Sequence, residues 1–372
     1  MKATKTLGYA LILMLAATMG WAGCDAAAGL GGGGAGDILD DITGGGGGLD
    51  GDGDGTGGED GNGATGAGDP IEISVFATNT GTDASGIALR PSDGALFLVN
   101  RDGLFGPIAE DADLSTLDPI GAENLFDADL FDMETGGFVL AISEAGEFWI
   151  GTASASTLAV VPPEGGDAEP FLGLVQGGVD VSNVNPETMA FVPDGFSGPQ
   201  MQPGNLLVGE EAGQSDLSAI DVAGDRAVVN VDKPLDEEGD LIVRLAHHLA
   251  FGPDDTLYGS NDVASALNAG IQTIDTDGVP TDLPGTVGVS ARSFVVLDDG
   301  DLLIRGVYDP ADGATVNGII LWDADTEAVT IFEDLPDTDL SGNDELIISA
   351  DRSTIYLALP ERSEIWRGTD NR

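Results

Sequence analysis

The histidines and the basic residues, which could bind a metal ion or an anionic ligand, are few enough in this chain to be traced one by one. The two histidines are adjacent, at His247 and His248, and Arg101, Arg292 and Arg305 are among the few basic residues. Oxygen ligands favour calcium or magnesium, while a neutral imidazole admits zinc or manganese. Guanidinium groups pair with anions. These residue types indicate a ligand or metal site, provided that the fold brings them together.

The elements that would position them follow a repeat. An apolar run, a tight turn and a second apolar run recur six times, as in GIALRPSDGALFLVN, FVLAISEAGEFWIG and FVVLDDGDLLIRG. The turns lie about 45–55 residues apart, which is the period of a β-propeller blade. We therefore predict an all-β, six-bladed β-propeller. Seven blades are the alternative, because no outer strands can be assigned in residues 101–136.

Outer strands are predicted after several of these pairs, at residues 157–161, 169–175, 217–222, 226–231, 271–275, 318–323 and 328–332. Near the C-terminus, residues 363–368 form a third strand with no fourth after it. Residues 71–77 precede the first pair without a blade of their own. Pairing these two segments would complete the sixth blade and remove two exposed sheet edges. We expect the ring to close in this way.

The two innermost strands of a blade are antiparallel, so the start of the first and the end of the second meet at one face of the ring. We call this the opening face. The strand starts include Glu187, His247, His248, Arg292, Asp344 and Glu345. The strand ends include Asn100, Arg101, Glu210, Glu211, Asn261, Asp262 and Arg305. A protein or small-molecule ligand is expected to bind at this face.

Each of these groups also has a purely structural interpretation. Successive strand residues point to opposite sides, so only one of His247 and His248 can point along the site, and that histidine could serve packing alone. The arginines could neutralise neighbouring acids. The aromatic side chains in strand patterns are expected to pack in the core: Trp149, Trp322, Tyr356 and Trp366.

The segment ISVFAT followed by GIALRPSDGALFLVN resembles the propellers of the NHL-repeat and gluconolactonase-like (senescence-marker protein) group, over residues 71–368. In lactonases of that group a Glu, an Asn and an Asp hold a divalent metal at the central channel. The matching first strand here, DASGIAL, has no Glu. The nearest candidates for the three ligands are Glu187, Asn261 and Asp262. The resemblance implies that these residues would hold calcium, manganese or zinc, with His247 or His248 as the acid–base group.

The N-terminus has the three parts of an export signal: Lys2 and Lys5, an apolar stretch over residues 7–19, and small residues leading to Cys24. The stretch is shorter than the about 20 residues that span a membrane. TMGWAGC resembles a bacterial lipobox, and Cys24 is the only cysteine. We expect cleavage after residue 23, lipidation of Cys24 and anchoring to the outside of a bacterial membrane.

Residues 24–69 are dominated by Gly, Asp and Ala and are predicted to be a flexible, extended linker before a propeller domain at residues 70–372. Asp50, Asp52 and Asp54 match the first half of a calcium loop. The twelfth position is Gly61, where such a loop needs a bidentate Glu. A solvated acidic linker is therefore favoured over a weak divalent site.

The charge balance excludes one class of partner. The chain has 65 acidic and 13 basic residues, a formal net charge of −52, so phosphate backbones would be repelled. At 42% hydrophobic residues it can still bury a large core. We explain the acidic surface by salty surroundings, in which counterions screen the repulsion between like charges. Binding of a cationic partner is the alternative explanation. From the sequence we expect a monomeric, envelope-anchored binding or scaffold module, with a metal-dependent lactonase or esterase as the alternative.

Overall fold

The computed structural model describes residues 71–81, 86–125, 138–152, 158–171, 174–175, 186–210, 216–224, 227–231, 248–260, 270–310, 314–335 and 344–371. Regular structure in these ranges is β-strand, apart from the short 3-10 helices η1 (Leu114–Thr116) and η3 (Pro360–Arg362). No helix in the same ranges is long and apolar enough to cross a membrane. The predicted signal, Cys24 and the linker lie outside the described residues.

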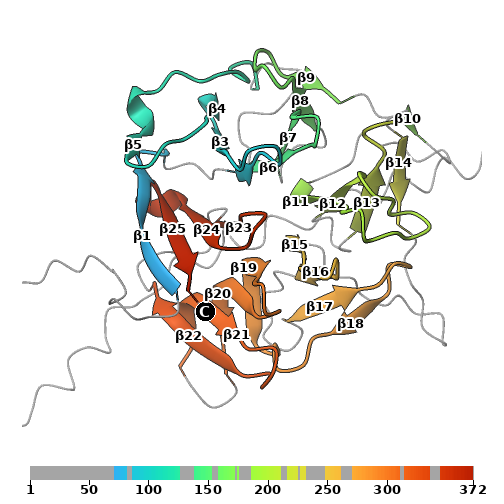
Figure 1. Ribbon diagram of the computed structural model, residues 1–372, viewed down its shortest axis with the longest axis vertical. Helices are drawn as coiled ribbons and strands as arrows, with labels where there is room; N and C mark the ends of the chain where they lie inside the picture. The colour runs from blue at the N-terminus through green and yellow to red at the C-terminus, as the bar shows by residue number, and fades with distance from the viewer. Residues whose placement is uncertain are drawn as a thin grey trace, which may run out of the picture. The chain divides into compact units, whose positions relative to one another are not determined.

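Six β-sheets follow one another and form the predicted six-bladed propeller (Figure 1). Blade 1 contains β2 (Gly86–Leu89), β3 (Leu96–Asn100) and β4 (Gly103–Phe105). Blade 2 contains β6 (Phe138–Ile142), β7 (Phe148–Thr152), β8 (Ala159–Val161) and β9 (Glu169–Pro170). Blade 3 contains β11 (Pro186–Phe191), β12 (Leu206–Glu210), β13 (Asp216–Ile220) and β14 (Ala227–Asn230), with β10 (Leu174–Val175) parallel to β14.

Blade 4 contains β15 (His248–Phe251), β16 (Leu257–Ser260), β17 (Ile271–Ile274) and β18 (Pro280–Asp282). Blade 5 contains β19 (Val289–Val296), β20 (Leu302–Tyr308), β21 (Val316–Trp322) and β22 (Val329–Asp334). Blade 6 contains β23 (Glu345–Ile348), β24 (Thr354–Leu359), β25 (Glu364–Asp370), β1 (Ile71–Thr78) and β5 (Ala112–Asp113). Contacts between innermost strands run from β2 through β6, β11, β15, β19 and β23 back to β2.

Several inner strands are buried along their whole length because each sheet is covered on both faces by its neighbours. The segments LFLVN in β3, FVLAI in β6 and FWIGT in β7 are buried at every position. The outer strand β22, with its sequence VTIFED, has no fully buried residue. A sheet with two covered faces loses the strict alternation of a surface strand. Hence the repeat shows as short unbroken apolar runs.

The core is divided among the junctions between blades. One hydrophobic cluster joins blades 1 and 2, where Phe97 and Phe148 lie with ring centroids 4.9 Å apart. Corresponding clusters join each of the other five neighbouring pairs. The predicted core aromatics occupy these junctions: Trp149, Trp322 and Trp366 are buried, and Tyr356 packs edge-on against Phe76. Burial of apolar surface therefore stabilises the ring as a whole.

Ring closure by the two chain ends is confirmed. β1 pairs antiparallel with β25 from Ile71 opposite Asp370 to Thr78 opposite Glu364, with a bulge between Val75 and Ala77. β5 then pairs in parallel with the outer edge of β1. Blade 6 thus has five strands, one more than expected, and its last strand comes from the segment that follows blade 1. This addition covers an edge that would otherwise be open to pairing with another chain.

Blade 1 is the unit whose outer strands the sequence left unassigned. Its third strand is β4, and the described residues give it no regular fourth strand. Instead Gly121 forms a bridge to Leu104 in β4 and another to Gly166 of blade 2. A Cβ at Gly121 would lie 2.4 Å from the carbonyl oxygen of Gly166. A glycine is required because two backbones meet there.

Candidate binding face

The strand register assembles the opening face as predicted. Pro186 lies opposite Glu210, His248 opposite Ser260, and Ser293 opposite Arg305. The starts of the innermost strands and the ends of their partners therefore share one side of the ring. The tight turns that join them lie on the other side, which we call the turn face.

One position recurs around the channel, three residues before the end of each innermost strand. We call it the rim position, and its occupants are Gly86, Val139, Thr188, His248, Ser293 and Glu345. Four of these are polar, and each of the four forms a hydrogen bond with the innermost strand of the next blade. The rim is thus a series of side chains that tie blade to blade.

Three of the rim bonds use a backbone N–H donor. The amide of Leu249 donates to Thr188 Oγ1 at 3.2 Å, and that of Leu346 donates to Ser293 Oγ at 3.0 Å. The amide of Ile87 donates to Glu345 Oε2 at 2.7 Å, which links the last blade to the first. Each bond gives a backbone donor of an innermost strand a partner in the preceding blade. The rim bonds therefore contribute to ring closure as well as to packing.

His248 forms the fourth rim bond. Its Nε2 lies 3.0 Å from the carbonyl oxygen of Phe294, and its ring packs edge-on against the Phe294 ring at 4.9 Å. A carbonyl only accepts, so Nε2 carries the hydrogen in this arrangement. His248 is half-buried. The imidazole predicted for acid–base work thus also joins blades 4 and 5.

At Gly86 the rim has no side chain, and the backbones approach closely. A Cβ there would lie 2.9 Å from the amide nitrogen of Leu140 in blade 2. Blades 1 and 2 therefore meet through backbone at the rim. The Asp, Ala and Ser that precede Gly86 lie outside the described residues.

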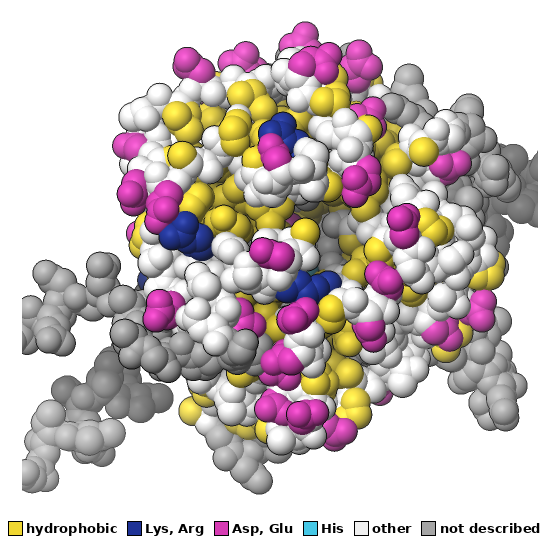
Figure 2. Space-filling model, in the orientation of Figure 1, with side chains coloured by type: hydrophobic (Ala, Val, Ile, Leu, Met, Phe, Trp, Pro, Cys, Tyr) yellow, Lys and Arg dark blue, Asp and Glu magenta, His cyan; other side chains and the backbone are white. Residues whose placement is uncertain are grey.

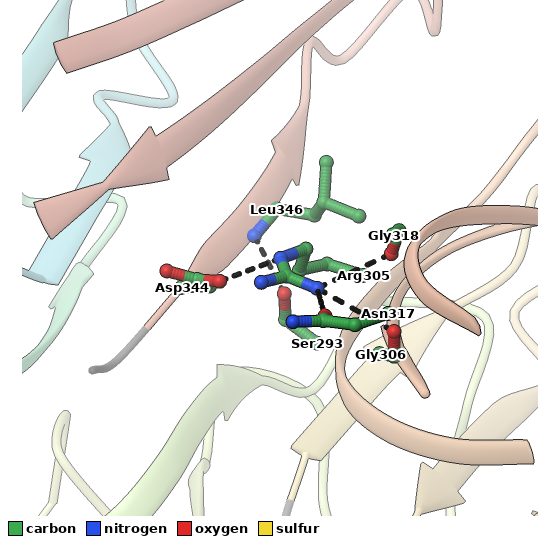
Figure 3. A network of polar contacts seen from close by, with 7 residues as sticks. All are labelled: Ser293, Arg305, Gly306, Asn317, Gly318, Asp344 and Leu346. Atoms are coloured by element: carbon green, nitrogen blue, oxygen red, sulfur yellow. Dashed lines mark hydrogen bonds and ion pairs between the residues drawn. The ribbon is translucent and has the colours of Figure 1, made fainter. Parts of the chain in front are cut away.

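The side chain of Arg305 is fully enclosed. Figure 3 shows it at the centre of a network of polar contacts. Its Nε lies 2.5 Å from Asp344 Oδ2. Its Nη1 donates to Asn317 Oδ1 and to the carbonyl oxygens of Gly306 and Gly318, the last two at 3.4 and 3.3 Å. Arg305 comes from blade 5 and Asp344 from the start of blade 6. The pair therefore joins the same two blades as the Ser293–Leu346 bond.

Two carboxyl groups beside this junction have strongly raised pKa values. Burial raises the pKa of Asp344 to about 7, against the attraction of Arg305 and with added repulsion from Glu361. Burial raises the pKa of Glu345 to about 8, although the Ile87 amide favours its ionised form. Both shifts follow from removing a charge from water. At neutral pH the Glu345 carboxyl is mainly the neutral acid, and Asp344 is close to its midpoint.

The remaining predicted residues lie at the same face in different settings. The Asn100 side chain is buried, donating to Thr80 O at 2.9 Å and accepting from the Asp102 amide at 2.8 Å, so it shapes the β3–β4 turn. Arg101 is exposed in that turn, while Glu187 and Arg292 are half-buried at bulges in β11 and β19. These three charged side chains reach solvent around the rim.

Several predicted residues cannot be placed. His247, Glu211, Asn261 and Asp262 lie outside the described residues, and only the backbone of Glu210 is described. The proposed metal set therefore keeps only Glu187 in view, and it stays a prediction. Within the described ranges no three His, Cys, Asp or Glu side chains are placed to hold a metal ion.

Sequence reasoning missed some of the polar residues that hold the ring. Thr188, Ser293 and Asn317 look like ordinary strand residues, but alignment of the six repeats on their turns places the first two at the rim position. Arg352 was also missed. From the β23–β24 turn its Nη1 donates to Val296 O and its Nη2 to Phe251 O, the latter at 3.0 Å. It thereby joins blade 6 to blades 5 and 4 on the turn face.

The surface carries the acidic character of the chain. In the face seen in Figure 2, Asp and Glu side chains are spread over the surface and the Lys and Arg side chains form a few separate spots. Some of the arginines are paired locally, as Arg90 is with Asp93 at 2.6 Å and Arg367 with Glu110 at 2.7 Å.

No protein-family model matches the chain. A search of curated proteins also gives no match. Solved structures do: a gluconolactonase from Xanthomonas campestris is 14% identical, with 82% of this chain and 93% of that chain covered and a TM-score of 0.51. A family AA12 carbohydrate-active enzyme from Trichoderma reesei is 13% identical, with 82% and 98% covered and a TM-score of 0.50. Virginiamycin B lyase from Staphylococcus aureus is 13% identical, with 80% and 99% covered and a TM-score of 0.48. At these identities the likeness concerns the fold.

Proposed function

We propose that this protein is a binding module of the bacterial cell envelope, anchored by a lipid on Cys24 and carrying its ligand site on the opening face of the propeller. The observation that carries the proposal is the rim. Thr188, His248, Ser293 and Glu345 each form a hydrogen bond with the next blade, which makes the channel mouth a rigid frame. A rigid frame lowers the entropic cost of binding a partner.

The groups around this frame are suited to polar recognition. Arg101 is exposed, and Arg292 and Glu187 are half-buried beside the rim. On a chain with net charge −52, Arg101 and Arg292 place two of the few positive charges at this mouth. A protein or small molecule with an acidic group could pair with these guanidinium groups. Bulk acidity elsewhere would keep the module soluble and monomeric.

The anchoring part of the proposal rests on the N-terminus. A basic start, a 7–19 apolar stretch and a single Cys24 in a lipobox-like setting match an exported lipoprotein. The Gly- and Asp-rich residues 24–69 would then act as a tether that holds the propeller away from the membrane. Replacing Cys24 with serine should abolish incorporation of labelled palmitate and move the protein out of the membrane fraction. Continued palmitate labelling of that variant would contradict the assignment.

The ligand site is tested by photo-cross-linking in intact cells. A photoreactive amino acid is placed at Arg101 or at Arg292, and as a matched control at Ser92, which is exposed in the β2–β3 turn on the turn face. We expect a discrete adduct from both opening-face positions and none from Ser92. Adducts of equal yield from all three positions, or from none, would contradict a site at the opening face.

The main competing function is the metal-dependent hydrolysis implied by the family resemblance. It requires Glu187, Asn261 and Asp262 to hold one ion at the channel. A screen of lactones and esters, run with and without a chelator, separates the two functions. Hydrolysis that the chelator abolishes would replace the binding module with the enzyme.

A further inference from the structure

The outermost strands of the six blades differ in length. β5, β9 and β10 have two residues each, β4 and β18 have three, and β22 has six. The outer side of such a strand presents backbone N–H and C=O groups that can pair with another chain. In Figure 1, β22 lies on the outside of the ring. Among the described residues, blade 5 therefore ends in the longest outermost strand.

The other outermost strands have features that oppose such pairing. In blade 1 the Leu104 amide of β4 donates to Gly121 O at 2.8 Å, so a neighbouring segment covers that edge. In blade 2 the side chain of Asn124 bonds both the N–H and the C=O of Ala168, beside β9, at 2.8 Å each. β18 begins with Pro280, which has no N–H. β10 and β5 are themselves short additions to the edges of β14 and β1. Covers, prolines and very short strands are common protections of a sheet edge.

β22 contains no proline, and no strand of the described ranges pairs with its outer side. The Asp323 amide donates to Ala328 O at 3.0 Å, which fixes a hydrogen-bonded pair at the start of the β21–β22 ladder. Hydrogen-bonded and non-hydrogen-bonded pairs alternate along an antiparallel ladder. In this register Val329 and Ile331 lie in non-hydrogen-bonded pairs, and Thr330 between them is bonded to β21. The backbone N–H and C=O groups of Val329 and Ile331 therefore point away from β21.

The side chains of β22 suit a strand partner. Val329 and Ile331 are β-branched, a type favoured in strands. The Ile331 side chain is 46% exposed, whereas Phe332 packs against the hydrophobic cluster between blades 5 and 6. Because Phe332 is packed, the strand is held in place, while Ile331 remains accessible to a neighbour. β22 thus presents a fixed, apolar strand edge.

Acidic side chains lie at both ends of this edge. Asp325 is exposed in the β21–β22 turn, and Asp334 is exposed at the other end of the strand. Glu333 is half-buried and is attracted by Arg362, so it is left out of this pair. Residues 306–351 contain no Lys or Arg. Like charges at both ends oppose pairing with a second copy of β22 and favour a partner of opposite charge.

We propose that β22 binds an extended, positively charged segment of a partner protein, which adds to blade 5 as a fifth strand. The backbone groups of Val329 and Ile331 pair with the segment, and a Lys or Arg at each end of it pairs with Asp325 or Asp334. In recognition of this kind, main-chain hydrogen bonds supply affinity and side chains supply specificity. At about 3.3 Å per residue, β22 spans about 20 Å, which places the two basic residues roughly six to seven apart. This edge lies on the outside of the ring, so it does not depend on the ligand site proposed for the opening face.

Hydrogen–deuterium exchange of the full chain with a synthetic peptide tests the proposal. The probe is Lys-Thr-Val-Thr-Val-Thr-Val-Lys, blocked at both ends, and we expect a dissociation constant of about 0.1–1 mM for so short a segment. The reporters are the amides of Val329 and Ile331, and the reference is the amide of Thr330, which is already bonded to β21. At a peptide concentration about four times the dissociation constant, exchange at both reporters should slow about fivefold, and exchange at Thr330 should change less. Unchanged exchange at the reporters in about 5 mM peptide would overturn the proposal.

Two control peptides separate the backbone and charge contributions. A peptide with Glu in place of both Lys keeps the backbone donors and reverses the charge. A peptide N-methylated at its central residues keeps the charge and loses the N–H donors. Neither should slow exchange at Val329 or Ile331. Equal slowing by the first would refute a cationic partner, and equal slowing by the second would refute strand addition. Slowing at the same amides without peptide, as the protein concentration rises, would assign the edge to a second copy and overturn the proposal.

A matched pair of double variants tests the acids. Asp325→Asn/Asp334→Asn removes one charge at the β21–β22 turn and one at the end of β22. It should weaken peptide binding roughly threefold to tenfold, since each exposed ion pair contributes little. Asp277→Asn/Asp282→Asn removes exposed acids from the corresponding places in blade 4 and should leave binding unchanged. Equal weakening by the two double variants would refute pairing of the peptide with the acids beside β22.

Discussion

Replacing Arg305 with methionine tests how the ring holds a buried charge. Methionine keeps most of the volume but removes the partner of Asp344 and the donor to Asn317 and the two glycine carbonyls. Breaking a fully buried ion pair from one side costs about 3–5 kcal/mol, mainly because the other charge is left unpaired. We expect this loss in the free energy of unfolding at pH 8.5, where Asp344 is ionised.

The loss should be smaller at pH 5.5. Without Arg305 the pKa of Asp344 rises further above its ordinary value, so at acid pH the carboxyl is neutral and no longer an isolated charge. Urea denaturation at both pH values measures the two losses, with Arg362→Met, an exposed arginine over Trp366, as control. The double variant Arg305→Met/Asp344→Asn should recover part of the stability at pH 8.5. The reasoning would be refuted if Arg305→Met lowered the free energy of unfolding no more than Arg362→Met does. It would also be refuted if Arg305→Met lowered it equally at the two pH values.

Three further predictions concern the ring. Deleting residues 71–77 removes the buried Ile71, Ile73 and Phe76 together with the strand that completes blade 6. The free energy of unfolding should fall by more than about 5 kcal/mol, so circular dichroism should show an unfolded ring. A wild-type melting curve for this variant would contradict closure by β1. Gly86→Ala places a Cβ 2.9 Å from the backbone of blade 2 and should lower the free energy of unfolding by about 1–3 kcal/mol. An unchanged free energy of unfolding would show that the backbones of blades 1 and 2 can move apart at this position. Glu345→Gln keeps the hydrogen bond to the Ile87 amide but removes an acid whose pKa is raised from 4.5 to about 8. The free energy of unfolding of the wild type should therefore fall as pH rises toward 8, while that of the variant should not. Parallel pH profiles of the two proteins would argue against a raised pKa of Glu345.

The architecture was predictable because propeller blades repeat. The turn-to-turn spacing of about 45–55 residues and the apolar runs predicted six blades, and the unmatched ends at residues 71–77 and 363–368 predicted closure. Both are confirmed. The fifth strand of blade 6 and the Gly121 bridge were not predictable. Each is a two-residue or one-residue pairing, and such short pairings leave no hydrophobic pattern.

The side of the ring on which the predicted residues lie was predictable, but the contacts between them were not. Antiparallel pairing of the inner strands was sufficient to assign Asn100, Arg292 and Arg305 to the opening face. Which side chains meet across blades depends on distances that no local pattern encodes. The Arg305–Asp344 pair joins residues 39 apart, and Arg352 reaches Phe251, 101 residues away. A rim of blade-to-blade bonds therefore becomes visible only in three dimensions.

The central claim is that the opening face binds a ligand within a rim of blade-to-blade bonds, rather than an ion used for hydrolysis. Elemental analysis of the full chain after exhaustive dialysis tests it most directly, with Glu187→Ala/Asp262→Ala alongside. We predict the same low metal content, well below one equivalent, in both proteins. About one equivalent of calcium, manganese or zinc in the wild type, lost in the variant, would contradict the account and assign the channel mouth to a metal-dependent hydrolase.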